Sequence, residues 1–129
     1  MIVVTGATGH VGNVLVRELV SRGEKVRALV LPSEDAGPLD GLPVERVEGD
    51  VLDIGSLMRA FEDANAVYHL AGIVAIRPGK NGLMHRVNVV GTRNAAEACL
   101  KTGVRRLVYT SSVHALVEPE EGMIIDEGC

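Results

Sequence analysis

A loop with three regularly spaced glycines constrains this chain most. The stretch "TGATGHVG" (residues 5–12) places Gly6, Gly9 and Gly12 between the apolar run "MIVV" and a helix-like run. A strand-to-helix turn points the unpaired, partly positive N–H groups of the first helical turn into a crevice. We predict that Gly6 permits the tight turn, Gly9 lets a pyrophosphate approach the backbone and Gly12 lets the helix pack closely. Glycines that serve only the turn are the alternative, but the flanking strand and helix favour a ligand.

Apolar β-like runs alternate with longer helical patterns along the whole chain. This alternation predicts an α/β protein with three layers, a Rossmann fold, whose doubly wound parallel sheet has about five strands in the order 3-2-1-4-5. Continuous apolar runs, "RLVY" among them, predict strands buried on both faces. In the first helix we expect Val11, Leu15, Leu19 and Val20 on the buried face. The expected strands are 1–6, 25–31, 44–49, 66–72 and 105–112, the expected helices are 10–23, 53–64 and 81–103, and 32–43 and 113–129 are expected to be mostly loop.

Length and composition indicate one globular domain over residues 1–129, because 47% of the residues are hydrophobic. The net charge of −4 and the three aromatic residues argue against a nucleic-acid partner. No apolar run is long enough to span a membrane, and the first residues do not resemble a signal peptide. Cys99 and Cys129 are isolated and lack metal-ligand spacing, so we expect a reduced, cytoplasmic setting and no metal site.

Five motifs in a fixed order resemble the extended branch of the short-chain dehydrogenase/reductase superfamily. The similarity is greatest to dihydroflavonol reductases and to the NAD-dependent epimerases and dehydratases that act on sugar nucleotides. It covers essentially the whole chain and implies the N-terminal, NAD(P)-binding portion of such a protein. The motifs are "TGATGHVG" (5–12), "GDVLD" (49–53), "VYHLAG" (67–72), "NVVGT" (88–92) and "RRLVYTSS" (105–112).

The resemblance implies roles for residues that follow the third and fourth strands. Asp50 would accept a hydrogen bond from the adenine amino group, with the Val51 backbone beside it. Leu70, Ala71 and Gly72 would line the path of the adenosine and of the second ribose. A solvent-exposed acid at position 50 and simple core packing at position 70 are the alternatives.

Other positions are implied to bind the cofactor from the remaining motifs. Thr8, His10 and Val11 lie in the phosphate loop, where the backbone N–H groups would act. Asn88 would tie the long helix to a neighbouring strand, and Thr110 lies in the motif of the fifth strand. His69, inside an apolar strand, is expected to be a core histidine with satisfied hydrogen bonds rather than a base.

The choice between NAD and NADP stays open at the sequence level. An acid at the end of the second strand would bind the ribose hydroxyls of NAD, whereas an arginine would pair with the extra phosphate of NADP. The matching position is Leu31, which decides nothing. Glu34 and Asp35 follow closely and can turn toward NAD, and Arg27 is a weaker candidate for NADP.

The catalytic groups implied by the resemblance are only partly present. Ser112 matches the serine that would hydrogen-bond the substrate carbonyl or hydroxyl. The family also uses a Tyr-x-x-x-Lys pair, in which the lysine lowers the pKa of the phenol. The two tyrosines are Tyr68 and Tyr109, and four residues later stand Gly72 and Val113. We therefore expect a chain truncated before the substrate-binding part, which binds cofactor but is catalytically incomplete.

Three functional alternatives remain at this level. The first is the NAD(P)-binding portion of an oxidoreductase or epimerase acting on a ketone or nucleotide-sugar, with the substrate bound only in the full-length protein. The second is a non-catalytic NAD(P)-sensing module. The third, a flavodoxin-like or sugar-binding domain, does not account for "GDVLD" and "TSS" together. The resemblance also implies that a homodimer can form through the long helix, where we expect Val89, Val90 and Ala96 to be partly uncovered.

Overall fold

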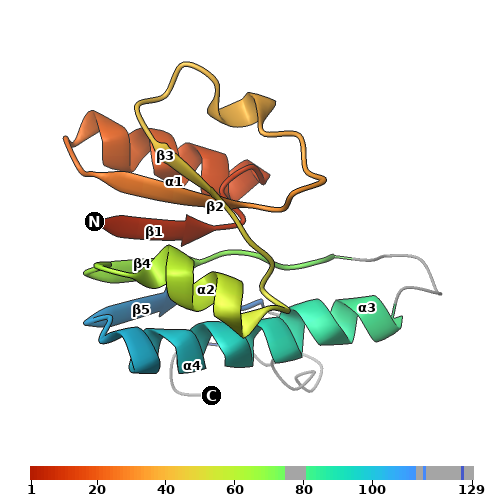
Figure 1. The fold of residues 1–129 in the computed structure, drawn as a ribbon. Coiled ribbons are helices and arrows are strands. Elements are labelled where there is room, and N and C mark those ends of the chain that lie inside the picture. Colours follow the sequence, from red (N-terminus) through yellow and green to blue (C-terminus); the bar gives the residue numbers. More distant parts are fainter. Residues whose placement is uncertain (75–80, 113–114, 116–125, 127–129) are drawn as a thin grey trace.

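Five parallel strands form one sheet in the computed structural model, which describes residues 1–74, 81–112, 115 and 126. The spatial order is β3-β2-β1-β4-β5 (Figure 1). Both the α/β class and the doubly wound strand order predicted from the sequence are therefore confirmed. The strands are β1 (Ile2–Thr5), β2 (Val26–Val30), β3 (Glu45–Glu48), β4 (Ala66–His69) and β5 (Arg106–Tyr109).

Helices cover both faces of this sheet and complete three layers. The helix α1 packs against β1 and β2 on one face, whereas α2 and α4 pack against each other on the other face (Figure 1). Asp53 caps the start of α2 by accepting a hydrogen bond from the Gly55 N–H at 2.9 Å. The helical elements are α1 (His10–Ser21), the 3₁₀ turn η1 (Gly37–Leu39), α2 (Ile54–Phe61), α3 (Asn81–His85), the π-helical segment η2 (Arg86–Gly91) and α4 (Thr92–Thr102).

The core is divided in two by the sheet, because successive strand residues point to opposite faces. Val3 and Leu29 belong to the cluster under α2 and α4. Val4, Ala28 and Val30 belong to the cluster under α1. These side chains are at most 6% exposed, so β1 and β2 are buried on both faces, as their apolar runs predict.

Leu15, Leu19 and Val20 of the first helix pack in the core as predicted, but Val11 does not. Val11 is 58% exposed, while Gly12, Val16 and Leu19 are buried. The buried stripe is therefore rotated by one residue at the helix start. The physical reason is the close approach of Gly12 to the preceding turn, which turns Val11 outward into solvent.

The prediction that β5 is buried on both faces is wrong. Leu107 is half-buried, but Arg106, Val108 and Tyr109 are exposed. β5 is the last strand at one edge of the described sheet, so it has a neighbour on one side only. An apolar run alone does not reveal whether a strand is central or at an edge.

The predicted long helix over 81–103 follows a helical path but contains a π-helical segment in its middle. Gly91 ends that segment and is buried. A β-carbon at Gly91 would lie 2.8 Å from the Cγ2 atom of Val51. The π segment thus ends where this helix closely approaches the "GDVLD" loop, and such segments often mark functional positions.

Candidate functional site

A cleft of about 320 Å³ lies at the carboxyl ends of the strands. It lies next to β1, where the strand order reverses: β2 follows on one side of β1 and β4 on the other. Parallel α/β sheets bind ligands at this topological switch point. The wall is mostly apolar and includes two acidic side chains. It is formed by Gly6, Gly9, Leu29, Leu31, Glu34, Gly49, Asp50, Val51, Leu52, Leu70, Ala71, Gly72, Ile73, Leu83 and Val87.

Two of the three loop glycines are required by the fold itself. Gly6 has a positive φ of 68°, and a β-carbon there would lie 2.7 Å from the backbone nitrogen of Ala71. A β-carbon at Gly12 would lie 2.0 Å from the carbonyl oxygen of Gly6. These obstacles are backbone atoms, so they cannot move aside cheaply. The predicted roles of Gly6 and Gly12, a tight turn and close packing, agree with these contacts.

The third glycine, Gly9, is not required by the fold in this way. It is the N-cap of α1 with φ −68° and ψ 168°, an extended conformation open to any residue. Beyond its chain neighbours, a β-carbon there would have one heavy atom within 4 Å, the Gly6 carbonyl oxygen at 3.3 Å. The first turn of α1 contains no acidic residue, and no side chain caps it. The loop therefore keeps an open space in front of a partly positive helix end, which fits a diphosphate.

The loop after β3 holds the predicted adenine-binding pair in the cleft wall. The Asp50 Oδ1 atom accepts a hydrogen bond from the Leu52 N–H at 2.8 Å. Asn94 on α4 donates from Nδ2 to the Val51 carbonyl at 2.9 Å. A carboxylate has about four acceptor positions, so Asp50 retains capacity for a ligand donor. Its role in binding adenine stays a prediction.

Glu34 lies just beyond β2, in the region where an acidic side chain would bind the ribose hydroxyls of NAD. Its Oε2 atom accepts a hydrogen bond from the Leu31 N–H at 3.2 Å, and its Oε1 atom accepts one from the Thr8 hydroxyl. The carboxylate thus bridges the glycine loop and the end of β2, and it lines the cleft. The side chain of Leu31, at the matching position, is 43% exposed.

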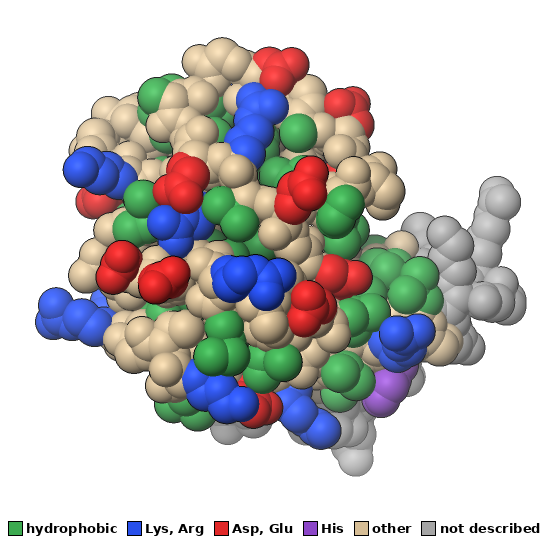
Figure 2. Space-filling model, in the orientation of Figure 1, with side chains coloured by type: hydrophobic (Ala, Val, Ile, Leu, Met, Phe, Trp, Pro, Cys, Tyr) green, Lys and Arg blue, Asp and Glu red, His purple; other side chains and the backbone are tan. Residues whose placement is uncertain are grey.

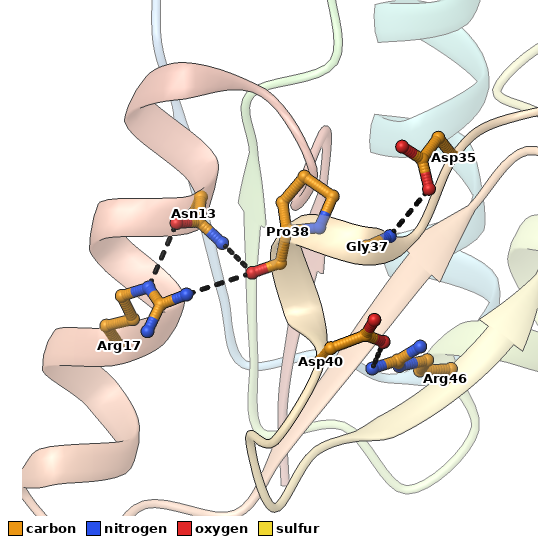
Figure 3. A network of polar contacts seen from close by, with 7 residues as sticks. All are labelled: Asn13, Arg17, Asp35, Gly37, Pro38, Asp40 and Arg46. Carbon is orange, nitrogen blue, oxygen red and sulfur yellow. Dashed lines mark hydrogen bonds and ion pairs between the residues drawn. The ribbon is translucent and has the colours of Figure 1, made fainter.

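A polar network anchors the segment that carries Glu34 to α1 (Figure 3). Asn13 Nδ2 and Arg17 Nη2 both donate to the carbonyl oxygen of Pro38, at 2.7 and 3.1 Å. Asp35 accepts from the Gly37 N–H at 2.9 Å, so its carboxylate is directed into its own turn. The loop after β2 is therefore held against the helix whose N-terminus borders the cleft.

Arg27 is not available as the NADP-binding residue considered above. Its Nη1 atom donates to the carbonyl oxygens of Ala60 and Glu62, both at 2.8 Å. Its Nε atom lies 3.0 Å from the Glu45 carboxylate, and its side chain is only 14% exposed. Arg27 lies near the start of β2 and joins this strand to the end of α2 and to β3, away from the residues that line the cleft.

Asn88 ties the long helix to the chain that leaves β4, as predicted. The Ile73 N–H donates to Asn88 Oδ1 at 2.8 Å, and Asn88 Nδ2 donates to the Ile73 carbonyl at 2.9 Å. Ile73 lines the cleft, whereas Asn88 supports it from behind. Direct contact of Asn88 with a cofactor stays a prediction.

His69 is a core histidine with satisfied hydrogen bonds, as expected. Its ring is fully buried, with Nδ1 2.7 Å from Thr5 Oγ1 and Nε2 3.2 Å from Thr92 Oγ1. The ring of Tyr109 stacks on it with centroids 5.8 Å apart. Burial lowers the pKa of His69 to about 4, so the imidazole is neutral near pH 7.

The residues after β5 lie beyond the described lining of the cleft. The Thr110 N–H donates to the His69 carbonyl at 3.2 Å, and Thr110 is exposed. Ser112 is also exposed, and its carbonyl accepts from the Ala115 N–H at 2.9 Å. The roles of Thr110 and Ser112 stay predictions, and Val113 falls outside the described residues.

The remaining loop residues occupy distinct positions around the start of α1. His10 and Val11 are exposed in its first turn, Thr8 is half-buried, and Gly12 is buried beneath the turn. Gly6, Gly9, Leu31, Asp50, Val51, Leu70, Ala71 and Gly72 are the predicted site residues that come together in the cleft.

Sequence reasoning missed several cleft residues and a buried polar group. Leu83 and Val87, four residues apart on α3 and η2, face the cleft, and this spacing on a helix was an available signal. Thr5 and Thr92 lie in two of the motifs, but no function was predicted from the sequence for either hydroxyl group. Their signal was a hydroxyl within an otherwise apolar element.

Neither a metal centre nor a membrane-spanning helix is found among the described residues. On the molecular face shown in Figure 2, acidic and basic side chains are interspersed. Among the described residues, the candidate site is the cleft that contains the glycine loop, Glu34 and Asp50.

Comparisons with known proteins identify the family of this chain. The sequence profile of the 3-beta hydroxysteroid dehydrogenase/isomerase family matches residues 3–128, so the chain belongs to this family. It is 50% identical over 113 residues, 88% of its length, to sterol demethylase protein B of Methylococcus capsulatus. It is 40% identical over 124 residues, 96% of its length, to a putative dihydroflavonol 4-reductase of Synechocystis.

A solved structure gives the same result in three dimensions. A short-chain dehydrogenase/reductase superfamily protein from Agrobacterium tumefaciens, with bound NAD, superposes with a TM-score of 0.76 at 38% identity. The match covers 87% of this chain and 32% of that one. The resemblance to extended short-chain dehydrogenases/reductases is thus confirmed, and the cofactor class of the family is NAD or NADP. The chain spans about a third of the two curated relatives, 34% and 36% of their lengths.

Proposed function

We propose that this chain binds a nicotinamide dinucleotide as the cofactor portion of an oxidoreductase or epimerase. The observation that carries the proposal is Gly9, whose backbone conformation any residue can adopt and whose β-carbon would meet the Gly6 carbonyl oxygen at 3.3 Å, far less closely than at Gly6 or Gly12. The open space in front of it meets the uncapped N-terminus of α1, where a diphosphate would accept backbone hydrogen bonds. The rest of the cleft is apolar enough to bury an adenosine.

Each wall of the cleft supplies a different part of the proposed binding. The first turn of α1 stabilises the negative charge of the two phosphates. Asp50 accepts from the adenine amino group, and Leu70 to Gly72 cover the path between the phosphates and the second ribose. When bound, the cofactor supplies hydride transfer. Ser112 is proposed to hydrogen-bond a ketone or nucleotide-sugar substrate in the full-length protein.

The substitution Gly9→Ala tests this proposal because it separates binding from folding. Its methyl group requires a shift of only a few tenths of an ångström from the Gly6 carbonyl oxygen, so we expect the free energy of unfolding to fall by less than about 1 kcal/mol. The same methyl group enters the phosphate space, so NADH affinity should fall at least about tenfold, equivalent to about 1.4 kcal/mol. Calorimetric titration and urea unfolding measure the two quantities.

Gly82→Ala is the matched control, since among the described residues a β-carbon at Gly82 meets no heavy atom within 4 Å beyond its chain neighbours and its own helix backbone. It should leave NADH affinity unchanged. Equal affinity of the Gly9→Ala variant and the unmodified chain would contradict the proposed site.

We further propose that the cofactor is NAD rather than NADP. The Glu34 carboxylate lines the cleft just beyond β2, where it would accept hydrogen bonds from ribose hydroxyls and repel a phosphate on the same ribose. Arg27, the cation considered for that phosphate, is occupied elsewhere.

The isosteric change Glu34→Gln should raise the affinity for NADPH relative to NADH by about tenfold, because it removes one negative charge beside the ribose. Asp35→Asn is the matched control. It changes the charge equally one residue away, but Asp35 faces its own turn. A similar shift in both variants would show a general charge effect and exclude Glu34 as the discriminating residue.

We also propose a cytoplasmic homodimer that forms through the α4 side. Val89 and Leu100 are 44% and 84% exposed, whereas Val90 and Ala96 are half-buried. The buried free thiol of Cys99 is compatible with a reducing compartment. Light scattering of the unmodified chain and of Leu100→Lys tests the dimer. A monomer at high concentration in both samples would contradict it.

A further inference from the structure

A chain of hydrogen bonds crosses the interior behind the cleft and links four elements. The Ala71 N–H lies 3.2 Å from Thr5 Oγ1, and Thr5 Oγ1 lies 2.7 Å from His69 Nδ1. On the other side of the ring, His69 Nε2 lies 3.2 Å from Thr92 Oγ1, whose hydroxyl donates to the Asn88 carbonyl at 2.7 Å. Thr5 immediately precedes the glycine loop, and Asn88 lies in the π-helical segment.

The donor and acceptor of each hydrogen bond follow from the backbone groups at the two ends of the chain, the Ala71 N–H and the Asn88 carbonyl. A carbonyl oxygen only accepts, so the Thr92 hydroxyl proton is committed to Asn88, and Thr92 Oγ1 must accept from His69 Nε2–H. The buried imidazole is neutral, so its Nδ1 atom carries no proton and accepts from the Thr5 hydroxyl. Thr5 Oγ1 in turn accepts from Ala71 N–H. Every donor and acceptor along the chain is used once, in one direction.

Both ends of this chain hold the same wall of the cleft. Ala71 is bound through Thr5, and Ile73 is bound by the side-chain amide of Asn88, whose carbonyl ends the chain. Ala71 and Ile73 both line the cleft. The segment that leaves β4 is thus fixed at two points to the glycine loop and to the long helix, and His69 joins the two.

We propose that Thr5, His69 and Thr92 form a relay that positions the 70–73 wall against the glycine loop, so that His69 is a positioning residue for dinucleotide binding. This inference rests on the proposed function. It differs from a purely structural role, in which the relay would only satisfy buried polar atoms. A structural role predicts lower stability on substitution, whereas the relay also predicts weaker binding by protein that remains folded.

The physical reason is the cost of a broken link. Removing the imidazole acceptor leaves the Thr5 hydroxyl without its partner in a site that excludes water, and an unsatisfied buried group is costly. The cheapest relief is a movement of the chain beyond β4, because the pairing of β4 with β1 ends at His69 and the side chains of Thr5 and Asn88 bind the segment that follows. Such a movement changes the cleft without unfolding the sheet.

The test compares variants with matched losses of stability, with NADH as the probe and the 129-residue chain as the protein. His69→Phe retains an aromatic ring but removes both ring nitrogens. Val67→Ala is the control, since Val67 is fully buried on the same strand and outside the relay. His69→Gln restores one acceptor and one donor. Circular dichroism at the titration temperature confirms that each sample is folded.

We expect His69→Phe to weaken NADH binding at least tenfold relative to Val67→Ala, and His69→Gln to recover part of that loss. If His69→Phe is not folded, the pair Thr92→Val and Thr92→Ser decides, because valine loses the hydroxyl while serine keeps it. The first should weaken binding, and the second should not.

Nitrogen-15 NMR of the unmodified chain reports the tautomer of the His69 ring independently of binding. We expect the ring proton on Nε2. Equal affinities of the His69→Phe and Val67→Ala variants, or a proton on Nδ1, would overturn the relay and leave the proposed function intact. Failure of the unmodified chain to bind NADH would instead overturn the proposed function, and the relay's role in binding with it.

Discussion

Acid should destabilise this protein through the buried imidazole of His69. The pKa of the folded imidazole is lowered by burial to about 4, from an ordinary value of 6.5. Between these values the unfolded chain binds a proton that the folded chain does not, so stability is present above pH 6.5 and is lost as the pH falls toward 4. At about pH 5 the loss from this group amounts to about 2 kcal/mol relative to pH 7.5. That is a large share of the stability of a typical domain.

The assay is urea unfolding at about pH 7.5 and pH 5, followed by circular dichroism, for the unmodified chain and for His69→Gln. Carboxylates and the other histidines titrate in both proteins, so the difference between the two pH dependences isolates His69. The unmodified chain should lose about 2 kcal/mol more than the variant. His85→Gln, which replaces an exposed histidine, should behave like the unmodified chain. Equal pH dependence in the unmodified chain and His69→Gln would refute the reasoning.

Two further predictions concern the packing of the fold. Gly12→Ala should cost at least about 1–3 kcal/mol in urea unfolding, because its β-carbon would meet the Gly6 carbonyl at 2.0 Å; a cost no larger than that of Gly82→Ala would show that the turn can relax. In a Cys129→Ser background, the Cys99 thiol should resist thiol reagents at about pH 8 until urea unfolds the chain, since burial raises its pKa to about 11. A rate of modification that is the same with and without urea would contradict this prediction.

The strand order and the position of the glycine loop could be predicted because they depend on local patterns. Alternating β-like and helical runs leave few topologies for a parallel sheet, and Gly6 and Gly12 lie at their expected turn and packing positions. The presence of Asp50 and Val51 in the cleft wall was also predictable, since they come shortly after a strand and therefore lie near its carboxyl end.

Burial at individual positions was less predictable from sequence. The exposure of Val11 and of β5 depends on helix rotation and on the position of the strand at the sheet edge. Arg27 resembled a solvent-facing or phosphate-binding residue, yet contacts with the end of α2 occupy its guanidinium. Each of these outcomes is set by a neighbour distant in sequence.

By itself, the sequence determined the fold class, the family resemblance and the glycine loop between β1 and α1, because the periodicity of apolar residues and the spacing of glycines act within a few residues. Only the tertiary structure decided that Glu34 bridges Thr8 and Leu31, and that Thr5, His69 and Thr92 form one hydrogen-bonded chain. Hydrogen bonds need partners within about 3 Å in a defined direction. The partners of His69 lie 64 and 23 residues away, so only the packed sheet and helices bring them together.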